Sequence, residues 1–130
     1  MIVVDASVVV TALADDGDDG DRVRERLRGE RLAAPHLIDL EVVSAWRRLA
    51  AAGQLDDRRV ALAMIDLGGL RIERAPHQPL VGRCWELRAS LTTYDASYVA
   101  LAEALDAVLL TGDRRLAEAP GGRCPVEVVS

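Results

Sequence analysis

The chain contains no phenylalanine, asparagine or lysine, and its aromatic side chains are few. Its cationic side chains, histidines aside, are therefore all arginines. These absences are typical of a genome rich in G and C and indicate a bacterial source. The formal net charge of −5 argues against a broad basic surface for nucleic acid. The negative charge does not exclude a nuclease that binds its substrate through a metal ion.

Cysteine and histidine are also scarce, which argues against a disulfide framework and against a zinc site. Cys84 and Cys124 form no paired motif, and His36 and His77 are too dispersed to be zinc ligands together. No basic leader follows Met1, and no apolar run approaches the roughly 20 residues of a membrane helix. We therefore expect a cytoplasmic protein with reduced thiols and no membrane segment.

The length of 130 residues is that of one ordinary domain, and half of the residues are hydrophobic. Apolar strands alternate with amphipathic helices. The predicted strands are residues 2–4, 32–35, 70–75, 107–111 and 126–129. The predicted helices are residues 7–14, 22–29, 36–52, 56–69 and 79–91, and a further helix capped by Thr92 or Thr93. This order predicts a single α/β domain over residues 1–130, with a central parallel sheet of about four to five strands and helices on both faces.

Two carboxylates follow predicted strands that are apolar throughout. Asp5 comes directly after Ile2–Val4, and Asp113 lies two residues beyond the strand that ends at Thr111. Unbroken apolar strands are typical of the middle of a parallel sheet. Because sites in open α/β sheets form at the carboxyl ends of the strands, we expect Asp5 and Asp113 to lie on one edge, and close together if their strands are neighbours.

Two further acids lie at defined positions on predicted helices. Glu41 lies about 70° from the centre of the apolar stripe of its helix, at the margin of the buried face. Asp95 falls in the first turn of the helix capped by Thr92 or Thr93. Each also has an ordinary structural interpretation, because Asp95 is placed to cap the helix and favour its dipole, and Glu41 to pair with Arg48 or another arginine.

Carboxylates brought together without a cation repel one another and raise each other's pKa, and a divalent cation relieves that repulsion. A cluster with oxygen ligands alone suits Mg²⁺ or Mn²⁺. Such a metal ion lowers the pKa of a bound water and stabilises charge on a phosphoryl oxygen. Ser7 and Thr111 lie beside Asp5 and Asp113 and either orient a water or ligand, or serve only as a helix cap and a strand end.

Two charged segments have less specific interpretations. The acidic run Asp15–Asp21 fails the calcium-loop spacing, because Arg26 stands where a count from Asp15 requires glutamate. We expect a solvated loop that caps the next helix. The arginines of residues 22–31 form either a phosphate-binding rim or a solvated face paired with Glu25 and Glu30.

Four segments together resemble a known family. They are Ile2–Ser7 (IVVDAS), Glu41 within its helix, Tyr94–Ala102 (YDASYVALA) and Leu110–Leu116 (LTGDRRL). In this order and at this length they resemble the PIN-domain family, and within it the VapC toxins of bacterial VapBC toxin–antitoxin systems. The Tyr-Asp-Ala and Leu-Thr-x-Asp blocks are the most specific parts of the likeness.

The resemblance implies an endoribonuclease that depends on Mg²⁺ or Mn²⁺ and acts as the toxin of a type II pair. Asp5, Glu41, Asp95 and Asp113 match the four acidic positions of the family. By that likeness Asp5 and Asp95 are the main metal ligands, and Glu41 and Asp113 complete the shell, directly or through water.

The resemblance also implies partners. It predicts a homodimer, an RNA substrate, and a VapB-like antitoxin whose C-terminal segment covers the acidic site. Amphipathic segments bind in apolar grooves, so the predicted helices 7–14 and 56–69 are the expected surface for it.

Other functions explain the acids less well. A PIN-domain nuclease in RNA processing, without a toxin role, uses the same residues. A phosphoacceptor receiver domain needs a lysine that this chain lacks, and a phosphatase with a nucleophilic aspartate needs a second aspartate where Ser7 stands. A non-enzymatic binding module would leave the four matched acids as a coincidence.

Overall fold

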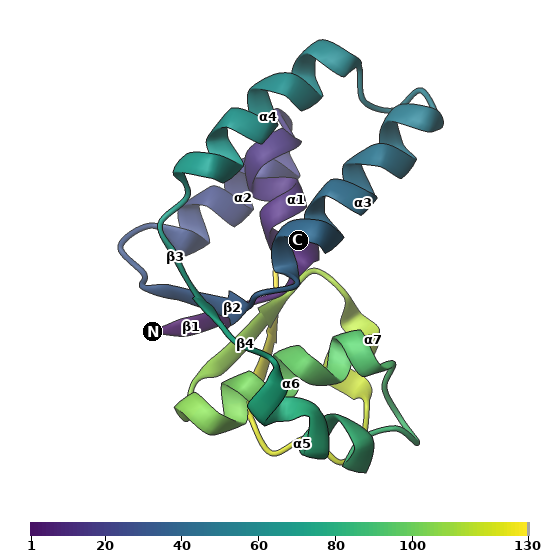
Figure 1. Ribbon diagram of the computed structural model, residues 1–130. Coiled ribbons are helices and arrows are strands. Elements are labelled where there is room, and N and C mark those ends of the chain that lie inside the picture. Colours follow the sequence, from purple (N-terminus) through teal and green to yellow (C-terminus); the bar gives the residue numbers. More distant parts are fainter. Residues whose placement is uncertain (130) are drawn as a thin grey trace.

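A five-stranded parallel sheet forms the middle of the protein in the computed structural model, which describes residues 1–129 (Figure 1). The strands lie in the order β3-β2-β1-β4-β5, and each neighbouring pair is parallel. They are β1 (Ile2–Val4), β2 (Leu32–Pro35), β3 (Ile72–Ala75), β4 (Val108–Thr111) and β5 (Val126–Val128). The predicted α/β class and parallel sheet are confirmed.

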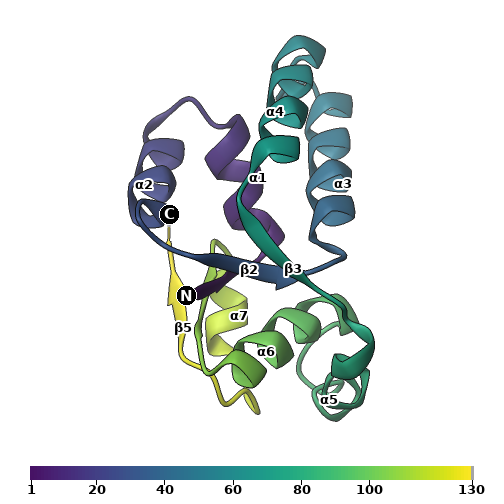
Figure 2. The ribbon, with the colours of Figure 1, turned by 60° about the vertical axis from the view of Figure 1, so that its left-hand side comes forward.

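Helices cover both faces of this sheet, as Figures 1 and 2 show from two directions. One layer contains α1 (Ala6–Ala14), α2 (Asp18–Leu27), α3 (Ile38–Ala51) and α4 (Asp57–Gly69). The other contains α5 (Val81–Glu86), which follows the 3₁₀ turn η1 (Gln78–Leu80), and α6 (Thr93–Leu105) and α7 (Arg114–Glu118). No helix among residues 1–129 combines the length and apolar character needed to cross a bilayer.

The core is densest around β1 and α6. Val3 and Val4 of β1 are fully buried, as a central parallel strand requires. Every residue from Ala96 to Ala102 of α6 is buried, because this helix packs beneath β1, β2 and β4. The first turns of α1 and α6 are thereby held against the sheet.

Several predicted boundaries were wrong. Helix α2 begins at Asp18, inside the segment predicted as a loop, and α5 ends at Glu86 rather than at Leu91. Asp5, rather than Ser7, is the N-cap of α1. On α4 the buried positions are Ala63 and Leu67, whereas Met64 is 42% exposed.

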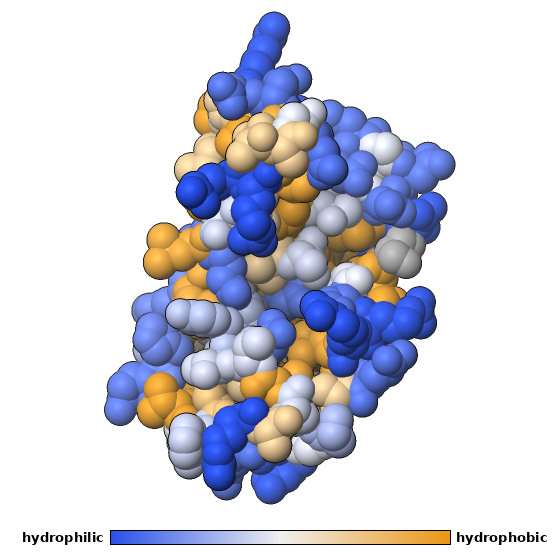
Figure 3. Space-filling model, turned by 90° about the vertical axis from the view of Figure 1, so that its right-hand side faces the viewer, coloured by the Kyte–Doolittle hydropathy of each residue, from blue (hydrophilic) through white to orange (hydrophobic). Residues whose placement is uncertain are grey.

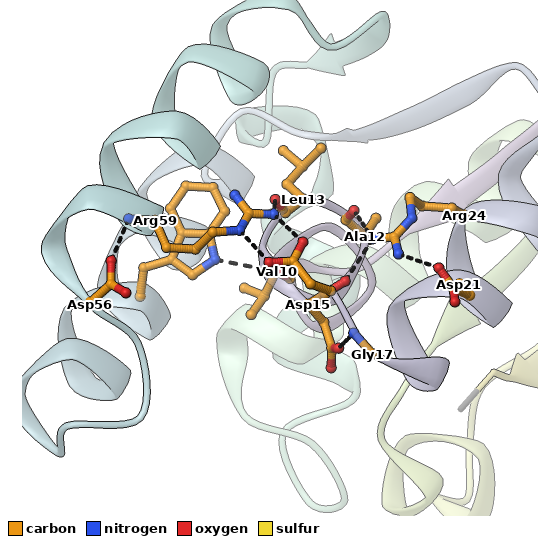
Figure 4. A network of polar contacts seen from close by, with 11 residues as sticks. Val10, Ala12, Leu13, Asp15, Gly17, Asp21, Arg24, Asp56 and Arg59 are labelled. Atoms are coloured by element: carbon orange, nitrogen blue, oxygen red, sulfur yellow. Dashed lines mark hydrogen bonds and ion pairs between the residues drawn. The ribbon is translucent and has the colours of Figure 1, made fainter.

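The far end of α1 is held by two arginines from neighbouring helices (Figure 4). Arg24 of α2 donates to the carbonyl oxygens of Ala12 at 2.9 Å and Asp15 at 2.7 Å. Arg59 of α4 donates to the carbonyl oxygen of Leu13 at 2.8 Å. The last carbonyls of a helix lack intrahelical partners, and cations are favourable at this end. These contacts fix the axis of α1, whose other end carries the acid that follows β1.

Candidate metal centre

Asp5 is the most constrained of the four acids. It is 7% exposed and caps α1, where its Oδ1 accepts from the amide of Val8 at 3.3 Å. Ser7 Oγ donates to the same oxygen at 2.5 Å, and Thr111 Oγ1 donates to Oδ2 at 2.5 Å. Burial raises the pKa of the Asp5 carboxyl, while these hydrogen bonds act to lower it.

Ser7 and Thr111 connect Asp5 to the chain that follows β4. Ser7 Oγ accepts from the amide of Gly112, and Thr111 Oγ1 accepts from the amide of Asp113, both at 2.9 Å. A Cβ at Gly112 would lie 3.2 Å from Ser7 Oγ, so glycine permits this close approach. The two hydroxyls therefore orient Asp5 and join the ends of two neighbouring strands.

Glu41 enters the same region from the first turn of α3 and is half-buried. The hydroxyl of Tyr98 on α6 donates to Glu41 Oε1 at 2.6 Å. The alternative interpretation, an ion pair with Arg48, is not what the structure shows, since Arg48 donates to Ser44 Oγ at 3.1 Å and acts on Glu41 only as a nearby charge. Tyr98 is 1% exposed, so it fixes the carboxylate from within the core.

Asp95 lies in the first turn of α6, where its amide donates to the cap residue Thr92 at 3.2 Å. Its carboxylate affects the other acids. Burial is the main cause of the raised pKa of Glu41, and the charges of Asp95 and Asp5 raise it further. The charge of Asp95 also contributes to the raised pKa of Asp5. The structure thus brings Asp5, Glu41 and Asp95 into one electrostatically coupled group.

Asp113 follows β4, which is the neighbour of β1 as the prediction required. It differs from the other three acids because an arginine side chain, that of Arg115, forms an ion pair with its carboxylate. Arg115 donates from Nη2 to Asp113 Oδ2 at 2.9 Å and from Nε to Oδ1 at 3.2 Å. This hydrogen-bonded guanidinium lowers the pKa of Asp113.

The donor set of these acids fits a hard divalent cation. All donors are oxygens, and three of the carboxylates are coupled by mutual repulsion, which a bound Mg²⁺ or Mn²⁺ would relieve. Among residues 1–129, no three Asp, Glu, His or Cys side chains are close enough as they stand to hold a metal ion. Coordination by this group therefore requires its side chains to move.

A pocket of about 240 Å³ opens beside the acids. Its walls include Asp95, Asp113, Arg115 and the hydroxyl residues Ser90 and Thr92. Larger hollows, of about 430 and 540 Å³, lie away from the acids, at the far end of α1 and beside the start of β2. Figure 3 views the side of the molecule on which α7 and the start of α6 lie, and apolar surface there is divided into small areas among hydrophilic side chains.

Two residues that contact the candidate acids, Tyr98 and Arg115, were not predicted from the sequence. Tyr98 lies three positions after Asp95, on the same side of α6, and this helical spacing was the available signal. Arg115 lies two positions after Asp113, in the segment already noted for its resemblance.

The arginines of residues 22–31 largely form a solvated face paired with acids, rather than a phosphate-binding rim. Arg26 pairs with Glu30 at 2.9 Å and with Glu127 at 2.6 Å, and Arg28 pairs with Glu25 at 3.3 Å. These arginines therefore balance surface acids in the free protein.

Comparison with known proteins agrees with the resemblance noted from the motifs. Residues 2–122 match the PIN domain. The chain belongs to the PIN-domain family. Two relatives from Mycobacterium tuberculosis, named Ribonuclease VapC9 and Ribonuclease VapC1, are each 45% identical to this PIN-domain chain, over 129 and 128 residues. The alignments cover 99% and 98% of this chain and 98% and 96% of those proteins.

A solved structure shares the fold. The structure of VapBC2 from Rickettsia felis, bound to a DNA fragment from the promoter of these proteins, contains a chain that aligns with a TM-score of 0.67. The alignment covers 100% of both chains at 16% identity.

Proposed function

We propose that this PIN-domain protein is a metal-dependent endoribonuclease and the toxin of a type II toxin–antitoxin pair. The observation that carries the proposal is the coupled group of Asp5, Glu41 and Asp95, beside Asp113, at the carboxyl edge of the sheet. The names of relatives that are 45% identical over nearly the full length support the ribonuclease assignment. Asp5, Glu41, Asp95 and Asp113 are the proposed catalytic and metal-binding residues.

Each acid has a distinct place in this proposal. Asp5 is a pre-oriented ligand, because Ser7, Thr111 and the Val8 amide already fix both of its oxygens. Asp95 is the second main ligand, and its partly exposed side chain has the freedom to approach.

Glu41 and Asp113 complete the shell, directly or through water. Tyr98 holds Glu41 in position, and Thr111 holds the backbone of Asp113. When bound, Mg²⁺ or Mn²⁺ would supply a water of lowered pKa and charge stabilisation at the phosphoryl oxygen. The acids of this chain would orient that water for attack on the RNA phosphodiester.

The proposed partners are an RNA substrate, a VapB-like antitoxin and a second copy of the chain, in the cytoplasm. The antitoxin assignment is supported by the VapBC assembly named for the structural neighbour. Of the two helices expected to bind the antitoxin, α1 buries Val8, Val9, Ala12 and Ala14. Exposed apolar side chains support a docking surface on α4, where Leu62 and Ile65 are 51% and 71% exposed, extended by Leu40 of α3, which is 76% exposed. Such a surface is typical of a site for an amphipathic segment.

Cleavage of a mixed RNA pool tests the enzyme assignment. Purified protein, free of antitoxin, is incubated with EDTA, Mg²⁺ or Mn²⁺, beside Asp5→Asn, Asp95→Asn and the matched control Asp57→Asn. Asp57 is exposed at the start of α4 and lies outside the acidic group, so its variant should retain full activity. We expect cleavage only with metal ion and its loss in the Asp5 and Asp95 variants. Equal activity in all folded variants would contradict the proposal.

The toxin role is tested separately in cells. Expression of the protein alone should arrest growth, and co-expression of the small gene adjacent to its own should restore it. Growth that is unaffected by an active ribonuclease would instead support a PIN-domain nuclease in RNA processing.

A further inference from the structure

Arg115 is a cation held at the edge of the acidic group. Its guanidinium contacts both oxygens of Asp113, and the amide of Arg115 also donates to Oδ1 at 2.9 Å. The side chain of Arg115 is 88% exposed, whereas that of Asp113 is 34% exposed. Exposed ion pairs are weak, so this contact can exchange for another at little cost.

The pocket beside this pair has the character of a site for a phosphate and its sugar. Arg115 and the hydroxyl residues Ser90 and Thr92 line it, together with Leu91 and Leu116. Asp95 and Asp113 border the same pocket, so an anion bound there would lie next to the proposed metal ligands. Arginine binds phosphate through two parallel N–H donors, which gives direction as well as charge.

Because the protein is acidic overall, attraction of RNA depends on cationic side chains close to the site. The net charge is −5, and the other ion pairs shown among the described residues tie arginines to acids outside the candidate site. Arg74 is held by Asp39, and Arg83 by Glu103, in partly buried pairs. Arg115 combines high exposure with a position at the acidic group.

We propose that Arg115 binds a backbone phosphate of the RNA in this pocket, and that Asp113 holds the same guanidinium while the protein is free. The inference rests on the proposed function, because it names a substrate contact of that site. One carboxylate cannot fully engage both the guanidinium and a metal ion. Asp113 therefore competes with RNA for the Arg115 guanidinium in the free protein.

RNA binding in EDTA tests this directly, because the proposed cleavage cannot occur without metal ion. The affinity of a labelled single-stranded RNA pool is measured by fluorescence anisotropy for wild type, Asp113→Asn, and Asp113→Asn combined with either Arg115→Ala or Arg114→Ala. Asp113→Asn releases the guanidinium and should tighten binding about two- to fivefold, the scale of an exposed ion pair. The gain should vanish with Arg115→Ala and persist with Arg114→Ala.

Arg114 is the matched control, because it is the neighbouring arginine of α7 and its removal changes the net charge equally. A gain in affinity that survives Arg115→Ala would overturn the inference, and Arg115 would then be a surface charge or a contact for a protein partner. Equal losses in both double variants would also overturn it, since the effect would be one of net charge.

The outcome is separable from that of the proposed function. Metal-dependent cleavage by wild type together with an unchanged affinity on loss of Arg115 would refute only the inference. An RNA affinity that depends on Arg115, without cleavage under any metal ion, would refute only the enzyme assignment.

Discussion

Replacement of Tyr98 by phenylalanine removes one buried hydroxyl and leaves the packing of α6 intact. The ring is 1% exposed, and its hydroxyl donates to Glu41 Oε1 at 2.6 Å. No other described side chain donates a hydrogen bond to this carboxylate. The substitution therefore changes how Glu41 is oriented without changing the ligand itself.

The size of the effect follows from the kind of bond that is lost. A hydrogen bond to a charged group contributes about 1.5–3 kcal/mol, and loss of a residue that orients a metal ligand lowers metal affinity or activity about 10–100-fold. We expect Tyr98→Phe to weaken Mn²⁺ binding and to lower kcat/KM for RNA cleavage within that range. Because the acids remain, high concentrations of Mn²⁺ should restore part of the activity.

The assay is a titration of Mn²⁺ binding by calorimetry, followed by cleavage kinetics over a range of Mn²⁺ concentrations. Tyr94→Phe is the matched control, since Tyr94 precedes Asp95 in the same segment and is 63% exposed. The control should match wild type. Mn²⁺ affinity and activity of Tyr98→Phe within about twofold of wild type, a difference below the value of one hydrogen bond, would refute the role given to Tyr98.

Three further outcomes are expected. Thr111→Val keeps the shape of the side chain but leaves Asp5 without one donor, so urea denaturation should show a loss of about 1–3 kcal/mol; an unchanged midpoint would contradict the role of this hydroxyl. Glu41 has a raised pKa, so its carboxylate holds a proton more readily in the native state than in the unfolded state. The free energy of unfolding therefore falls as pH rises from the pKa of an ordinary glutamate through the raised pKa of Glu41. In EDTA, Glu41→Gln should therefore melt at a higher temperature than wild type at neutral pH and lose this pH dependence, whereas a lower Tm would contradict the electrostatic argument. Glu103 has a lowered pKa because Arg83 and the Arg123 amide bind its carboxylate. Its contribution to the free energy of unfolding is therefore present at neutral pH and lost on acidification. Glu103→Gln should lower the free energy of unfolding by about 1.5–3 kcal/mol in the same urea assay, and no loss would show the pair to be unimportant.

The positions of two acids could be predicted from the sequence, because the apolar strands that precede them reveal their place in the sheet. Ile2–Val4 and the strand ending at Thr111 are apolar throughout, so both had to be central strands, and Asp5 and Asp113 had to follow them on one edge. Helical periodicity likewise placed Glu41 at the margin of α3, where it is half-buried.

The contacts that orient these acids could not be predicted in the same way, because they join elements that are distant in sequence. Thr111 bonds Asp5 across two neighbouring strands, and Tyr98 bonds Glu41 between helices on opposite faces of the sheet. A periodic pattern reports which face a residue lies on and says nothing about its partner there.

The start of α2 shows a second reason for failure. The segment from Asp15 to Asp21 is rich in aspartate and glycine, which favour turns over helices. In the structure Asp18, Asp19 and Asp21 lie in the first turn of α2, where acids favour the helix dipole. Packing of α2 on α1 and the contacts of Arg24 then outweigh the poor local propensity.

The location of a bound Mn²⁺ ion tests the central claim most directly. Crystals grown with Mn²⁺ would be measured near its absorption edge, so that an anomalous difference map shows the ion by itself. We predict a peak between Asp5 and Asp95, with Glu41 and Asp113 bound to it directly or through water and their side chains moved from their present positions. A peak elsewhere, or none at this edge of the sheet under conditions that support RNA cleavage, would contradict the account.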